Sequence, residues 1–100
     1  MINTGGEKVS PAAVEAVLLD QPGVGEVCVV GVPDPEWGQR VAVAVVGGLP
    51  DAALAAVRTA LGPAAVPRQV VAVASLPERG PGKVDRAAVA ELIRLRASGG

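Results

Sequence analysis

The spacing of apolar residues along the chain predicts three strands and three helices. Valine-rich runs of strand length occupy residues 24–32, 41–46 and 69–76. In the second run, valine at every odd position alternates mainly with alanine, so both faces of that strand carry apolar side chains. A strand of this kind is covered on both sides, and its alanine face allows a helix to sit close to the sheet.

The segments between these runs have the apolar spacing of amphipathic helices. The expected helices span residues 11–20, 52–61 and 86–96. Ser10 followed by Pro11 is a typical helix start, and Asp51 and Asp85 are the expected N-caps of the second and third helices. In the first helix we expect an inward apolar stripe with Glu15 pointing outward.

A β-hairpin over residues 2–10 is predicted ahead of the first helix. Gly5 and Gly6 separate two short β-capable segments, and a tight turn there needs the positive φ that glycine adopts readily. Two strands alone are marginal in water, so this hairpin either packs on another element or is mobile. The chain is therefore predicted to be one α+β domain over residues 1–100, with a small three-stranded sheet, helices on its faces and a separate N-terminal hairpin.

Composition narrows the chemistry that the chain can perform. Histidine is absent, which excludes Ser–His and Cys–His nucleophile pairs and histidine-ligated metal sites, and we predict no metal site in this domain. The one cysteine, Cys28, lies in a strand run, where we expect it to pack in the core. Because the sequence contains neither a signal-peptide pattern nor an apolar run of membrane-spanning length, the expected compartment is the cytoplasm.

The charged residues are distributed unevenly along the chain. The net charge of −1 argues against a nucleic-acid partner. Residues 1–67 carry three basic and seven acidic side chains, whereas residues 68–100 carry six basic and three acidic ones. The basic end suits a small anionic ligand, although a solvated basic helix end has the same composition.

Lys83 in this basic end is the leading candidate for chemistry. Two glycines and a proline precede it, and we expect them to form a loop that presents the lysine just ahead of the last helix. A Walker phosphate loop does not fit, because Pro77 stands where that pattern needs glycine and Val84 where it needs Ser or Thr. A single loop lysine is often only a solvated charge, so its meaning depends on the other motifs.

Four separated motifs occur in order and cover nearly the whole chain. They are residues 4–15, residues 27–39, residues 66–68 and residues 76–86. Together they resemble the C-terminal domain of the adenylate-forming acyl- and aryl-CoA synthetases. Within that family, the ending Gly-Pro-Gly-Lys-Val-Asp-Arg is most similar to the o-succinylbenzoate–CoA ligases of menaquinone synthesis.

The resemblance implies a two-step ligase reaction. A carboxylate reacts with ATP to form an acyl adenylate and pyrophosphate, and the acyl group then passes to the thiol of CoA. It also implies a large N-terminal domain that holds most of the nucleotide and acyl pocket and is the partner of a small rotating C-terminal domain. Both that N-terminal domain and the hinge residue that follows it are expected to be absent from this chain. Mg²⁺ is expected in the full-length enzyme but not on this domain, and the isolated chain is expected to be inactive.

The resemblance also assigns roles to individual residues. Lys83 corresponds to the catalytic lysine, which reaches the carboxylate and the α-phosphate in one pose of the domain. In the other pose the hairpin faces the active site and lines the pantetheine channel. The residues expected on this CoA side are Gly5, Gly6, Glu7, Lys8 and Trp37. Ala65 stands where many members of the family carry a lysine, which puts an additional basic contact to CoA in doubt.

Other interpretations of these residues remain open. The Gly5–Gly6 pair serves equally well as a simple turn, and Trp37 as a packing anchor for its loop. The arginines at positions 40, 68 and 86 are expected at a solvated or ion-paired surface. For the whole chain, the alternative is a small ferredoxin-like regulatory module that binds a ligand without catalysis, since the core order αββαβ is close to such folds. An upstream reading frame that encodes a large domain would discriminate the two.

Overall fold

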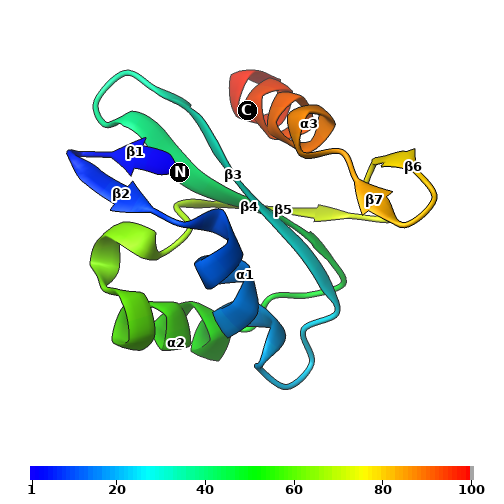
Figure 1. The fold of residues 1–100 in the computed structure, drawn as a ribbon, viewed down its shortest axis with the longest axis horizontal. Coiled ribbons are helices and arrows are strands. Elements are labelled where there is room, and N and C mark those ends of the chain that lie inside the picture. The colour runs from blue at the N-terminus through cyan, green and yellow to red at the C-terminus, as the bar shows by residue number, and fades with distance from the viewer. Residues whose placement is uncertain (100) are drawn as a thin grey trace.

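A computed structural model describes residues 1–99, with side chains as far as residue 96. Within these residues five strands form one sheet and two further strands form a small hairpin (Figure 1). The strands of the sheet are β1 (Ile2–Thr4), β2 (Glu7–Val9), β3 (Glu26–Asp34), β4 (Gly38–Val46) and β5 (Gln69–Val73). The hairpin consists of β6 (Glu78–Gly80) and β7 (Lys83–Val84). The helices are α1 (Pro11–Leu19), α2 (Asp51–Leu61) and α3 (Arg86–Gly99), with a 3₁₀ turn at Pro63–Ala65.

Strand β4 is the centre of the sheet. Strand β3 runs antiparallel to it, with all nine residues of each strand paired. Strand β5 runs parallel along the opposite edge, beginning with Gln69 beside Ala42. Strand β1 joins that same edge nearer the start of β4, where Thr4 lies beside Gly38. Both edges of the central strand are therefore covered.

The predicted α+β class is confirmed, but the expectation of a three-stranded sheet with a separate hairpin is wrong. The β1–β2 hairpin extends the sheet, which therefore has five strands. Ile2 and Thr4 are buried at this junction, and the N–H of Gly5 donates to the main-chain oxygen of Trp37 at 3.0 Å. The unpaired edge of β4 gives the hairpin main-chain partners that an isolated pair of strands lacks.

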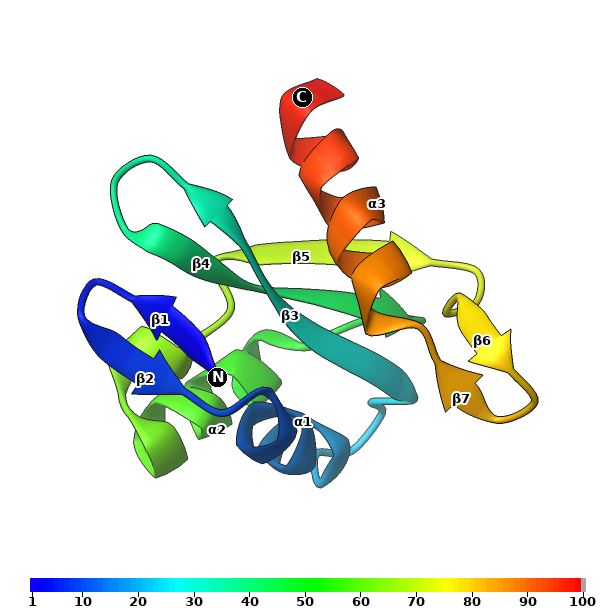
Figure 2. The same ribbon diagram turned by 45° about the horizontal axis from the view of Figure 1, so that its top comes forward.

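Helices cover both faces of the sheet, as the alternation of valine and alanine in β4 predicted (Figures 1 and 2). The valine face packs against α1 and α2, in a cluster that includes Val14, Leu18, Val43, Val45 and Val57. The alanine face packs against α3, in a cluster that includes Cys28, Ala42, Ala44, Val89 and Ile93. The small alanine side chains leave room for α3 close to the sheet. Helix α1 lies on the opposite face.

Two of the three predicted helix caps are confirmed. Ser10 Oγ accepts the N–H of Ala13 at 3.2 Å, and Asp85 Oδ1 accepts the N–H of Ala88 at 3.0 Å. The expectation that Asp51 caps α2 is wrong, because it is the first residue of that helix and Pro50 is the cap. The acidic side chain still lies in the first turn, where it interacts favourably with the helix dipole.

The strand ends differ from those predicted. The third predicted strand stops at Val73, because the chain bends at residues 74–75 before it enters β6. Strand β3 has the predicted length but begins and ends two residues later than the apolar run, and β4 begins three residues earlier, because the two strands remain paired as far as Asp34 and Gly38, next to their connecting turn. No helix in the described part of the chain is both long and apolar enough to cross a membrane.

Candidate functional site

The segment around Lys83 folds as a short β-hairpin where we expected an irregular loop. Glu78 pairs with Val84 and Gly80 with Lys83, with one irregularity in the ladder. The turn contains Gly82, whose φ of 76° lies in the region that favours glycine. Pro81 and Gly82 thus form the turn, and Gly80 pairs with Lys83 on the opposite strand.

The base of this hairpin is bonded to the start of α3. The N–H of Asp85 donates to the main-chain oxygen of Pro77 at 2.8 Å, which ties the two ends of the hairpin together. The carboxylate of Asp85 caps α3 through the N–H of Ala88. Leu76, at the entry to the hairpin, is buried in the cluster beneath α3. The position of Lys83 therefore depends on how the first turn of α3 is held.

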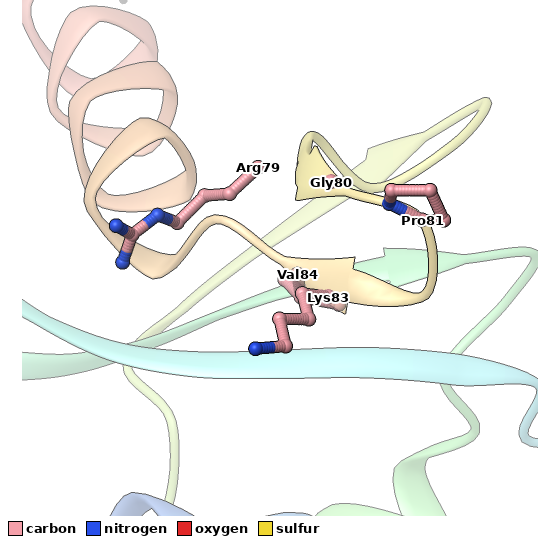
Figure 3. A pocket seen from close by; sticks show the side chains of 5 residues that line it. All are labelled: Arg79, Gly80, Pro81, Lys83 and Val84. Atoms are coloured by element: carbon pink, nitrogen blue, oxygen red, sulfur yellow. The ribbon is translucent and has the colours of Figure 1, made fainter.

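Lys83 is exposed beside an open pocket of about 500 Å³ (Figure 3). The residues that line this pocket are Arg79, Gly80, Pro81, Lys83 and Val84. The side chains of Arg79 and Lys83 extend in the same direction, away from Pro81. No acidic group among the described residues forms an ion pair with either of them. The pocket therefore presents two uncompensated cations, which suits the binding of anionic oxygens.

The two glycines of the N-terminal hairpin have different surroundings. Both have positive φ, 57° at Gly5 and 86° at Gly6. A Cβ atom at Gly5 would lie 2.5 Å from Cε3 of Trp37, whereas a Cβ atom at Gly6 would meet no described atom within 4 Å. Gly5 is therefore required by its contact with the indole, and Gly6 forms the open tip of the turn.

This difference predicts unequal effects of the same substitution. Gly6→Ala should destabilise the domain by about 1–2 kcal/mol, the usual cost of a side chain in left-handed backbone. Gly5→Ala should cost about 1–3 kcal/mol more, because its methyl group displaces Trp37. Denaturant unfolding of the two variants measures both values, and equal costs would show that the indole does not constrain Gly5.

Trp37 lies where its own loop meets the β1–β2 hairpin. Its ring lies against Gly5, and the guanidinium carbon of Arg68 lies 4.4 Å from the ring centroid. The main-chain N–H of Trp37 donates to Asp34 Oδ1 at 2.9 Å. This bond is the main reason why the pKa of Asp34 lies below its usual value, with further contributions from the N–H of Glu36 and the nearby arginines. Trp37 is half-buried, and its ring packs against the turn of the β1–β2 hairpin at Gly5.

The predicted site residues fall into two groups at opposite ends of the molecule. Lys83 lies on the β6–β7 hairpin, and the five expected CoA-side residues lie at or beside the β1–β2 hairpin, far from it in both views (Figures 1 and 2). Glu7 and Lys8 are exposed on β2. The structure therefore does not unite the predicted residues in one site, and each hairpin must be considered separately.

Glu15 was predicted to point outward, and this expectation is wrong. Its side chain is only 13% exposed and accepts two hydrogen bonds from Arg86, Nη1 to Oε2 at 2.7 Å and Nη2 to Oε1 at 2.8 Å. The N–H of Val29 also donates to Oε2 at 2.7 Å. The hydrogen bond with Glu15 raises the pKa of Arg86 further above its usual value. Position 15 lies beside the apolar stripe of α1, and this was the available signal that it faces β3.

Cys28 is buried in the core, as predicted. Burial raises the pKa of its thiol to about 11, an effect that the positive charge of Arg86 partly offsets. The thiol is therefore protonated at neutral pH and is a poor nucleophile. Across the described residues no three His, Cys, Asp or Glu side chains gather in a way that could hold a metal ion.

Comparisons with known proteins indicate one family over most of the chain. Residues 13–83 match the AMP-binding enzyme C-terminal domain. A medium/long-chain-fatty-acid–CoA ligase of Mycobacterium tuberculosis is 42% identical over 89% of this chain and 18% of its own length. A probable 2-succinylbenzoate–CoA ligase of the same species is 45% identical over 88% of this chain and 24% of its own length. The mitochondrial malonate–CoA ligase of Homo sapiens is 42% identical over 89% of this chain and 16% of its own length.

Solved structures show the same fold. A fatty acyl CoA synthetase of Mycobacterium tuberculosis superimposes with a TM-score of 0.87 and 32% identity, over 96% of this chain and 20% of that one. The amide bond synthetase McbA of Marinactinospora thermotolerans gives a TM-score of 0.83 and 40% identity, over 91% of this chain and 19% of that one. The chain thus spans less than a quarter of the length of these relatives.

Proposed function

Because this chain belongs to the AMP-binding enzyme C-terminal domain family, we propose that it is the mobile C-terminal domain of an ATP-dependent acid–CoA ligase. Such an enzyme joins a carboxylate to ATP, releases pyrophosphate and transfers the acyl group to CoA. The observation that carries the proposal is Lys83, an exposed cation on the β6–β7 hairpin. The base of that hairpin is held by the hydrogen bond from Asp85 to Pro77 and by the buried side chain of Leu76. The family match favours this function over a ferredoxin-like regulatory module.

Lys83 is the proposed catalytic residue of the first step. Adenylation brings a carboxylate toward a triphosphate, so that like charges approach one another. The ammonium group of Lys83 offsets this repulsion where the carboxylate and the α-phosphate meet. A lysine is suited to this role because its compact charge lies at the end of a long flexible side chain.

The N-terminal hairpin is the proposed contact for CoA in the second step. Gly6 has open space around it and no side chain, so a slender pantetheine arm can pass close to the backbone there. Glu7 and Lys8 lie next to this tip, and Trp37 holds Gly5 in place. Because the two hairpins lie at opposite ends of the domain, we propose that the domain rotates between the two steps.

The partner in this proposal is a larger N-terminal domain of the same enzyme, as in relatives of which this chain spans 18–24%. ATP, CoA and a small carboxylic acid are the substrates, and the compartment is the cytoplasm. The Mg²⁺ that accompanies ATP is proposed to bind outside this domain, since the described residues contain no group of ligands that fits it.

We further propose o-succinylbenzoate as the acid. The identity of 45% with a probable 2-succinylbenzoate–CoA ligase supports this choice. Fatty-acid and malonate ligases are 42% identical, so these acids are the necessary comparison substrates.

The test compares the complete protein that contains this chain with the chain alone. The complete protein should release pyrophosphate from ATP in the presence of one of these acids and then form the CoA thioester. Residues 1–100 alone should do neither. Turnover by the isolated chain, or full adenylation activity after removal of these residues from the complete protein, would contradict the proposal.

A further inference from the structure

Glu15 and Arg86 connect the two helical layers around one edge of the sheet. Glu15 belongs to α1, which packs on the valine face, and Arg86 is the first residue of α3, which packs on the alanine face. Their side chains meet through two hydrogen bonds of 2.7 and 2.8 Å. A paired arrangement of this kind fixes the guanidinium and the carboxylate in one relative orientation.

The pair also bonds the exposed edge of β3. The N–H of Val29 donates to Glu15 Oε2 at 2.7 Å, and its main-chain oxygen accepts from Arg86 Nη1 at 3.0 Å. In the described part of the chain β4 is the only strand that pairs with β3. The two side chains therefore occupy the place of a neighbouring strand at Val29 and satisfy main-chain groups that an edge leaves open.

The hairpin that carries Lys83 depends on this connection because its own packing is weak. The residues of β6 and β7 are exposed, apart from a half-buried Gly80. Only Asp85 separates β7 from Arg86, and the N–H of Asp85 closes the base of the hairpin on Pro77. Fixing Arg86 against β3 therefore fixes the direction in which the hairpin leaves the body of the domain.

We propose that Glu15 and Arg86 are a positioning pair for Lys83: by holding the first turn of α3 against the edge of β3, they set where the lysine enters the active site. Neither residue touches substrate in this proposal. It rests on the proposed ligase function, and it adds two residues that act on adenylation through the orientation of the hairpin.

The experiment measures both half-reactions in the complete enzyme for Arg86→Gln, Glu15→Gln and the double variant. Arg86→Gln should lower kcat for adenylation roughly tenfold to a hundredfold, the range expected when a catalytic group is displaced by about 1 Å. KM for ATP and for the acid should change little, and transfer from pre-formed acyl adenylate to CoA should be unaffected. The double variant should be much less impaired than the two single losses combined would give, because either change alone already breaks the bonds between Glu15 and Arg86.

Two further variants separate positioning from general stability. Arg94→Gln is the matched control, because it breaks an exposed ion pair with Glu91 on the same helix, away from the hairpin. Arg86→Lys retains the charge without the two-pronged geometry and should recover only part of the adenylation rate. If Arg86→Gln does not fold, Arg86→Lys and Glu15→Gln provide the same comparison.

Three outcomes decide the matter. Adenylation loss confined to the Glu15 and Arg86 variants supports the positioning pair. Equal losses in both half-reactions, or an Arg86→Gln rate that matches that of Arg94→Gln, overturn it. If the parent enzyme forms no acyl adenylate, or if Lys83→Ala does not slow adenylation, the proposed function fails first and the positioning role fails with it.

Discussion

Replacing Lys83 with alanine in the complete enzyme should slow acyl-adenylate formation by about two to three powers of ten. One charge pair at about 4 Å and an effective dielectric near 20 is worth roughly 4 kcal/mol, and the exposed pocket reduces this figure. The interaction is made in the transition state of the first step, so transfer to CoA should remain at the parent rate. Pyrophosphate release and thioester formation from pre-formed acyl adenylate measure the two steps separately.

The control for this prediction removes a charge elsewhere. Arg96→Ala takes an exposed cation from the last turn of α3 and should leave both half-reactions unchanged. The unfolding midpoint of Lys83→Ala should match that of the parent, because the side chain has no bonding partner among the described residues. Equal losses in the two steps, or an unchanged first step, would mean that Lys83 is a solvated surface charge.

The second large effect is expected at the tip of the N-terminal hairpin. Gly6→Trp should slow acyl transfer to CoA by about a hundredfold or more while adenylation stays near the parent rate, because an indole at this tip obstructs a near-attack geometry for the pantetheine thiol. The domain should still fold, since nothing described lies within 4 Å of a Cβ atom at Gly6. Single-turnover transfer from pre-formed acyl adenylate provides the measurement.

Gly47 offers a matched control for this variant. It has a φ of 90° and equally open surroundings, but it follows β4 and lies outside both hairpins. Gly47→Trp therefore introduces the same backbone strain and the same side chain without obstructing the proposed channel. If the Gly6→Trp enzyme transfers its acyl group as fast as the Gly47→Trp enzyme, the N-terminal hairpin is only a turn and does not line the path of CoA.

The features that the sequence predicted correctly depend on neighbouring residues. The alternation of valine and alanine in β4 determines both buried faces, and Ser10 and Asp85 cap helices that start within three residues of them. The features that it missed join distant segments. Thr4 meets Gly38 across the sheet, and Glu15 meets Arg86, 71 positions further along the chain. No local pattern specifies such partners, because they follow from how the packed layers bring the segments together.

For the candidate site, the sequence indicated the exposed residues but not the residues that hold them in place. The resemblance located Lys83 and the glycine pair, and each proves to lie on an exposed hairpin. The residues that hold these hairpins were not identified, since Glu15 reads as a surface charge when only its helix is considered. The supporting residues reach the hairpins through contacts between distant segments, whereas a sequence motif contains only the residues near the exposed one.

The position of Trp37 gives the domain an internal optical reporter. It is the only aromatic residue in the chain, which contains no tyrosine or phenylalanine. Near-ultraviolet absorption and emission of the isolated domain therefore arise from one indole, which lies next to Gly5 and beneath the guanidinium group of Arg68. A change in the hairpin tip alters the surroundings of that indole directly, so its fluorescence follows this turn without a label and without a second emitter.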